Sequence, residues 1–266
     1  MKTQLKTIAL AVSLLGAAQA HAFDLCGGMC ATPIEVAAGS TFTIGSIFTN
    51  PVTPSSPISS GVGSITQITG PTGPTYNFAG LGTAQVNFVF SNYVLDASST
   101  ATNAFFNMGV INVYVTPTGT FNPFGAGNQA TDIAAASSGT LVLTLTGHAF
   151  PAGHIPADQV GHTSAATGTN LFGLLGGLSQ GTEIGLLDST GGLFAANFDT
   201  NSQEDGADFT FNAGFDNSLS ALHGWGLGGA ANLQTTAIPE PSTVALLGLG
   251  LLGFGVSSIR RRKSAE

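Results

Sequence analysis

Lysine and arginine are absent from the whole middle of this 266-residue chain, from Phe23 to Ile238. All six basic residues lie at the two ends, whereas 12 of the 14 acidic residues lie in the middle part, because only Glu240 and Glu266 fall outside it. Nucleic-acid binding is excluded, since neutralising phosphates requires Lys or Arg. Phosphorylated substrates are disfavoured for the same reason. The fold of this part has to rest on apolar burial and backbone hydrogen bonds, without Lys or Arg ion pairs.

Cysteine is also scarce, and its two copies, Cys26 and Cys30, lie in the stretch DLCGGMC. In an oxidising compartment two such cysteines form a disulfide by default, and Gly27 and Gly28 allow the tight loop. Two cysteines alone do not make a zinc site. A Cys26–Cys30 disulfide closes a small ring, so we expect it to stabilise the fold only modestly.

Tryptophan and tyrosine are rare, with one Trp and three Tyr against 18 Phe. Sugar-binding clefts more often display Trp and Tyr, so the aromatic content gives no support to a lectin. We expect the phenylalanines to serve mainly as core residues.

The first 22 residues have the pattern of a secretory signal peptide. Lys2 and Lys6 give a positive start, Ile8–Leu15 is a short apolar stretch, and the sequence AQAHA supplies a small-residue cleavage site. We expect export by the Sec translocation machinery and cleavage after Ala22, which leaves Phe23 as the first residue.

The C-terminal end combines a short motif, an apolar run and a basic cluster. The apolar run, residues 242–259, carries no charge, and as a helix its part from Val244 to Ile259 reaches about 24 Å, slightly less than a hydrocarbon core of about 30 Å. Short spans are tolerated through changes in tilt and local thinning of the bilayer. A basic cluster after such a run stays on the cytoplasmic side, which predicts a single transmembrane helix. The motif is Pro239, Glu240 and Pro241, and the basic cluster is Arg260, Arg261, Arg262 and Lys263.

In order and spacing, these features resemble a PEP-CTERM protein of a Gram-negative bacterium. The resemblance implies recognition of Pro239–Pro241 by exosortase, a membrane-embedded transpeptidase-like enzyme, and cleavage near that motif. It further implies transient anchoring in the inner membrane, then transfer to the cell surface or extracellular matrix and association with exopolysaccharide. The Phe- and Gly-rich body, with its stretch DFTFNAG, is similar to flocculation-associated PEP-CTERM proteins. The chain then divides into a signal peptide (1–22), an extracellular domain (23–236) and a sorting signal (237–266).

Five segments of the body alternate apolar and polar residues with a period of two, which is typical of half-buried strands. Gly- and Pro-rich stretches such as 51–63, 70–74 and 125–128 separate them and predict turns. Strands joined by such loops predict an all-β fold, an antiparallel β-sandwich followed by the C-terminal transmembrane sorting helix. The five segments are 41–49, 84–90, 111–116, 140–146 and 207–215.

Three of the five histidines lie in one stretch, GHAFPAGHIPADQVGH, directly after a predicted strand. Neutral imidazoles with a carboxylate suit Zn²⁺ or Fe²⁺. The H-E-x-x-H pattern of catalytic zinc sites is absent, and the prolines and glycines indicate a loop that either wraps a metal or faces solvent. The candidate ligands are His148, His154, Asp158 and His162.

A second cluster, FDTNSQEDGADF, gathers oxygen donors around Gly206. Ca²⁺ binds about six to eight oxygens, so this stretch is a candidate calcium site. The order of an EF-hand loop is absent, since Glu204 stands where that loop needs its glycine. A solvated turn between two strands accounts for the same residues. The candidate ligands are Asp199, Asn201, Glu204, Asp205 and Asp208.

Three functions are open on this basis. The first is a non-catalytic structural or adhesive protein of the cell surface or matrix, which takes part in biofilm or floc formation. The second is a secreted metal-dependent hydrolase of matrix polymer that uses the histidine stretch. The third is a calcium-stabilised carbohydrate-binding module. We favour the first and expect no enzymatic activity, with Ca²⁺ or Zn²⁺ as the candidate ions of the other two.

Overall fold

The computed structural model of the protein describes residues 23–26, 35–36, 39–70, 75–77, 84–169, 171, 180–217 and 222–236. The predicted signal peptide, Cys30 and the sorting region 237–266 with its apolar run 242–259 lie outside the described residues, so the expectations for them stay predictions. Among the residues that are described, no helix is both long and apolar enough to cross a membrane.

Strands dominate the described part of the chain. They are β1 (Phe23–Asp24), β2 (Glu35–Val36), β3 (Thr41–Thr49), β4 (Ile58–Thr69), β5 (Thr75–Asn77), β6 (Ala84–Leu95), β7 (Asn103–Pro117), β8 (Thr140–His148), β9 (Ser164–Thr169), β10 (Gln180–Gly191), β11 (Phe209–Asp216) and β12 (Leu227–Thr235). The helical elements are short: α2 (Gln129–Ala136), α3 (Ala195–Phe198) and the 3-10 turns η1 (Ala157–Gln159) and η2 (Glu204–Gly206).

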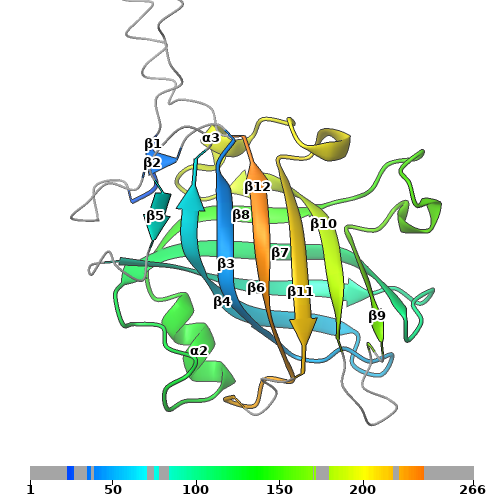
Figure 1. Cartoon of the computed structure of the whole chain (residues 1–266), viewed down its shortest axis with the longest axis horizontal. Coiled ribbons are helices and arrows are strands. Elements are labelled where there is room, and N and C mark those ends of the chain that lie inside the picture. The colour runs from blue at the N-terminus through cyan, green and yellow to red at the C-terminus, as the bar shows by residue number, and fades with distance from the viewer. Residues whose placement is uncertain are drawn as a thin grey trace, which may run out of the picture.

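Eight strands form a closed antiparallel barrel (Figure 1). Around the ring the order is β11, β12, β3, β4, β6, β7, β8 and β10, and β10 then pairs with β11. The all-β class is confirmed, but the predicted β-sandwich is wrong. Alternation along a strand indicates only that one face is buried, and sandwiches and barrels both bury one face of each strand. The pairing of β10 with β11 is what distinguishes the two, and no local pattern reports it.

Register shifts and glycines accompany the curvature of the barrel wall. The β3–β4 pair changes register on both sides of Ile44. On β4, Gly63 leaves room for the ring of Phe88 from β6, which an added Cβ would overlap. Neighbouring strands can therefore approach closely while a large ring fills the interior beside them.

β8 and β9 both lie between β7 and β10, one beyond the other along these two strands. β8 pairs with residues 110–115 of β7 and 186–191 of β10, and β9 pairs with residues 103–106 of β7 and 180–185 of β10. Between the two strands, residues 149–163 leave the barrel wall as a loop. This loop carries most of the histidine stretch.

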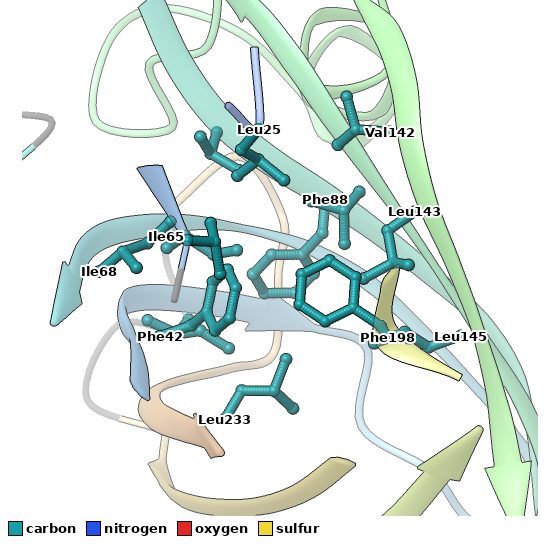
Figure 2. Close-up of a cluster of buried hydrophobic side chains, with 14 of the residues drawn as sticks. Leu25, Phe42, Ile65, Ile68, Phe88, Val142, Leu143, Leu145, Phe198 and Leu233 are labelled. Carbon is teal, nitrogen blue, oxygen red and sulfur yellow. The ribbon is translucent and has the colours of Figure 1, made fainter. Parts of the chain in front are cut away.

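Apolar side chains from the strands fill one end of the barrel interior (Figure 2). Phe198 of α3 packs against Phe42 and Phe209, with ring centroids 6.1 and 5.2 Å away. Leu25 joins the same cluster from the N-terminal segment, and Figure 1 shows β1, β2 and α3 gathered at one end of the barrel. Among the residues whose burial is described, ten phenylalanines are buried, in line with the expectation that they build the core.

Two segments cover parts of the outer wall. Helix α2 contacts β4 and β6, and the cluster beneath it contains Phe48, Val62 and Trp225. On another side, Phe150 of the loop 149–163 packs with Phe105 of β7 and with outward-facing residues of β9 and β10. Both covered areas are apolar, so these segments bury strand residues that point away from the barrel interior.

Candidate functional site

The residues of the histidine stretch have separate partners. Nδ1 of His148 lies 2.9 Å from both carboxylate oxygens of Asp188 on the neighbouring strand. Nδ1 of His162 lies 2.8 Å from Oδ1 of Asn107. The structure therefore directs these two histidines to different neighbours, and His154 lies in a third environment.

His154 belongs to the one group of three possible metal ligands in the described part of the chain, together with Glu204 and Asp205. Their ligand atoms lie within 4.8 Å of one another. Nδ1 of His154 lies 2.7 Å from Oδ2 of Asp205, and its Nε2 lies 3.1 Å from Oε1 of Gln159. The group combines one residue of the predicted zinc set with two of the predicted calcium set, whereas Asp158 is exposed in η1 and lies outside it.

Asp208 of the predicted calcium set organises a turn through backbone hydrogen bonds. Its side chain is buried, and Oδ1 accepts from the N–H groups of Thr200 and Asn201 at 2.6 and 2.7 Å. Oδ2 accepts from the N–H of Ser189 at 2.8 Å. Asp199 instead accepts a 3.4 Å hydrogen bond from the side-chain amide of Asn201. The five predicted calcium ligands are thus divided among several different interactions.

An uncharged polar face covers the outer side of five neighbouring strands, β11, β12, β3, β4 and β5. Cross-strand pairing aligns Thr, Asn and Gln side chains into two rows, and none of them is buried. Residues two apart on a strand share a face, so the two rows lie on the same side of the sheet. We call these residues the amide–threonine face. One row is Thr210, Gln234, Thr41, Thr69 and Thr75, and the other is Asn212, Asn232, Thr43, Gln67 and Asn77.

One end of the amide–threonine face borders a groove of about 240 Å³. Polar side chains from β11 and β12 line it beside apolar side chains from the outer side of β10. Glu204 also lines the groove, so the group of His154, Glu204 and Asp205 lies next to it. The lining residues used below are Thr210, Asn212, Asn232, Gln234, Ile184 and Leu186.

The barrel interior holds a cavity of about 130 Å³. Side chains from every strand of the ring and from β9 line it, and most of them are apolar. An eight-stranded barrel is just wide enough to be filled by its own side chains or to hold one small ligand. The cavity extends from the core cluster around Phe88 to a second cluster that contains Tyr93 and Phe106.

Glu183 of β10 and Tyr93 of β6 are polar residues in the lining of this mostly apolar cavity. Oγ of Ser164 donates a 2.7 Å hydrogen bond to Oε1 of Glu183. Burial raises the pKa of the Glu183 carboxyl above its ordinary value, and the bond from Ser164 offsets only part of that rise. Burial, and to a smaller extent the charge of Glu183, raises the pKa of the Tyr93 hydroxyl. The hydroxyl therefore stays protonated and can act as a hydrogen-bond donor.

The sorting region at the C-terminus is matched by a family model described as the PEP-CTERM protein-sorting motif, over residues 237–262. The chain is a PEP-CTERM protein. The resemblance to PEP-CTERM proteins that the sequence predicted from this region is thereby confirmed. As a PEP-CTERM protein, the chain is processed by exosortase, exported and sorted through the membrane to the cell surface. Searches of curated proteins and of solved structures find no match to this PEP-CTERM protein.

Proposed function

We propose that this PEP-CTERM protein is a non-catalytic component of the cell surface or extracellular matrix that associates with exopolysaccharide and contributes to biofilm or floc formation. The observation that carries the proposal is the amide–threonine face, which offers neutral hydrogen-bonding groups on the outside of the barrel. The groove at one end of this face adds an apolar border formed by Ile184 and Leu186.

A hydroxyl-rich polymer suits such a face. Amide and hydroxyl side chains can both donate and accept hydrogen bonds, and neighbouring strands repeat about every 4.8 Å, so the two rows form a regular array. The body carries 12 acidic residues and no Lys or Arg, so an acidic polymer would be repelled by most charged parts of its surface. Neutral contacts on the amide–threonine face support binding without that repulsion.

The test uses protein purified from exporting cells and exopolysaccharide isolated from the same cells. We expect the triple variant Asn212→Ala, Asn232→Ala and Gln234→Ala to bind the polymer about tenfold more weakly or worse, since each neutral hydrogen bond contributes about 0.5–1.5 kcal/mol. Affinity electrophoresis in gels that contain the polymer measures the change. Asn103→Ala with Thr167→Ala is the matched control, because both residues are exposed outside the face. Equal weakening in the control would argue against a specific surface.

The non-catalytic part of the proposal has its own test. Exopolysaccharide incubated with the protein is expected to keep its molar mass, measured by light scattering after size-exclusion chromatography. Progressive shortening of the polymer by the wild type would contradict this part of the proposal, whatever the affinity.

A metal-dependent hydrolase is the second candidate, favoured by the group of His154, Glu204 and Asp205 beside the groove. Catalytic zinc sites use three protein ligands and leave a position for water. Zinc that is stoichiometric in the wild type and in His148→Ala, but lost in His154→Ala together with polymer cleavage, would support the hydrolase. A rise in Tm with Ca²⁺ and no cleavage would instead support the calcium-stabilised module.

A further inference from the structure

Tyr93 lines the cavity of the barrel, and its hydroxyl is buried without a hydrogen-bond partner in the described part of the chain. The residue is 5% exposed, and no described residue forms a hydrogen bond with its Oη. Nearly all buried polar atoms in folded proteins are paired. An unpaired hydroxyl on a side chain that lines the cavity is therefore open to a partner that enters the cavity from outside the chain.

Glu183 gives a second, independent indication. It lines the same cavity, and its Oε1 accepts a hydrogen bond from Ser164. A carboxyl group has about four acceptor positions, so capacity remains after that bond. Glu183 is half-buried among mostly apolar side chains, where a carboxylate is unfavourable unless it is paired, and the chain between Phe23 and Ile238 contains no Lys or Arg that could pair with it. A donor supplied from outside the chain would remove this deficit.

The size of the cavity limits what can enter. An apolar cavity of about 150 Å³ inside a protein holds a molecule of roughly the size of benzene. The cavity of this barrel, at about 130 Å³, is close to that size. Its lining includes the apolar side chains of Phe88, Phe106 and Ile111. The occupant therefore has an apolar part of roughly six carbon atoms.

We propose that the barrel interior binds one small apolar molecule whose head group is an alcohol or an ammonium, with the head at Glu183 and Tyr93 and the tail among the apolar side chains. The shared feature of these heads is that they donate a hydrogen bond and carry no negative charge. A carboxylate head on the same tail is rejected, because it has no hydrogen to donate to Glu183 and is repelled by the ionised form of Glu183, with no Lys or Arg in the body to offset the repulsion.

The experiment compares three probes with the same six-carbon tail, namely 1-hexanol, hexylamine and hexanoate. Each is titrated at neutral pH into protein purified from exporting cells, and binding is measured by isothermal titration calorimetry. We expect hexanol and hexylamine to bind at one molecule per barrel, at least about tenfold more tightly than hexanoate. Absence of binding by all three, or hexanoate binding as tightly as hexylamine, would overturn the proposal.

Three variants locate the site. Glu183→Gln keeps the size of the side chain and removes its charge, so the preference for hexylamine over hexanoate is expected to fall at least about tenfold. Tyr93→Phe is expected to weaken hexanol and hexylamine, and Ala213→Leu to block all three probes by filling the cavity that Ala213 lines. Asp158→Asn, at an exposed position outside the barrel, is the control and is expected to bind like the wild type. If folded Glu183→Gln, or folded Tyr93→Phe where the former does not fold, binds the probes like the wild type, the proposal is wrong.

Discussion

Nε1 of Trp225 donates a 2.7 Å hydrogen bond to Oδ2 of Asp132, a residue 93 positions earlier in the chain. The same carboxylate lies 2.9 Å from Nδ1 of His223, and Nε2 of His223 donates to the carbonyl of Gly125 at 2.7 Å. These bonds join the segment before β12 to helix α2, on the outer side of the barrel. In a body without Lys or Arg, the His223–Asp132 pair is one of the ion pairs that can still form.

The first prediction concerns the pH dependence of stability. The hydrogen bond to Gly125 and then the bond to Asp132 raise the pKa of His223. Because the folded pKa lies above the unfolded value of about 6.5, the contribution of His223 is fully present below that pH and is lost as pH rises through the raised pKa. We expect the Tm of the wild type to fall as pH rises from about 6.5 through the raised pKa of His223. The Tm of His223→Gln should fall less over the same pH range. His162→Gln is the control, because the partner of His162 is the uncharged Asn107. Its Tm should fall with pH as much as that of the wild type.

Five strands could be predicted because apolar and polar residues alternate strongly in them. The segment 41–49 coincides with β3, and the other four fall largely within β6, β7, β8 and β11. The strands β4, β10 and β12 were not predicted, since Gly, Ser, Ala and Thr occupy many of their alternating positions, as in LGGAANLQT. Part of β4 even lies in a stretch whose composition predicts a turn. In such strands the pairing with neighbours, rather than side-chain hydrophobicity, determines the structure.

The second prediction concerns the structural role of Asp208 in its turn. Replacing Asp208 by Asn puts an amide donor among three backbone N–H donors, so we expect a loss of about 1–3 kcal/mol in the free energy of unfolding. Urea denaturation followed by circular dichroism measures it. Asp158→Asn, at an exposed position, is the control and should change stability by less than about 0.5 kcal/mol. Wild-type stability in Asp208→Asn would show that these bonds are dispensable.

The third prediction tests the close packing of β10 inside the barrel. A Cβ added at Gly185 would overlap the ring of Phe211 and lie 2.9 Å from Cβ of Ser164. We expect Gly185→Ala to lower the free energy of unfolding by about 1–3 kcal/mol. Gly214→Ala on β11 is the control, since nothing lies within 4 Å of an added Cβ there. Combining Gly185→Ala with Phe211→Leu should cost less than the sum of the two single changes, because the smaller side chain relieves the overlap.

The fourth prediction concerns the sorting motif. Replacing Pro239, Glu240 and Pro241 together by Ala is expected to prevent processing by exosortase, so the residues 237–266 stay attached and the protein stays in the membrane fraction. Mass spectrometry of the C-terminal peptide distinguishes the intact from the processed chain. Changing Ser242 to Ala is the control and should leave processing intact. Release of the triple variant into the medium at the wild-type rate would refute the prediction.

The candidate sites were less predictable than the strands. The sequence showed that His154, Glu204 and Asp205 belong to ligand-rich stretches, but not that two different stretches meet. The amide–threonine face depends on register, which places Asn212 opposite Asn232 only after β11 and β12 have paired. Glu183 could not be predicted as a cavity residue, because the strand β10 that carries it was not predicted, and only the pairing shows that it shares the inward side of β10 with Leu187.

Closure of the barrel has a consequence for how many copies behave when crowded together. Every strand of the ring hydrogen-bonds to a neighbour on each side. Proteins with open sheet edges can join edge to edge by pairing their edge strands and so form fibrils. The ring strands of this molecule have no vacant edge for that reaction. A dense layer of these molecules would therefore not be joined by strand addition through the ring.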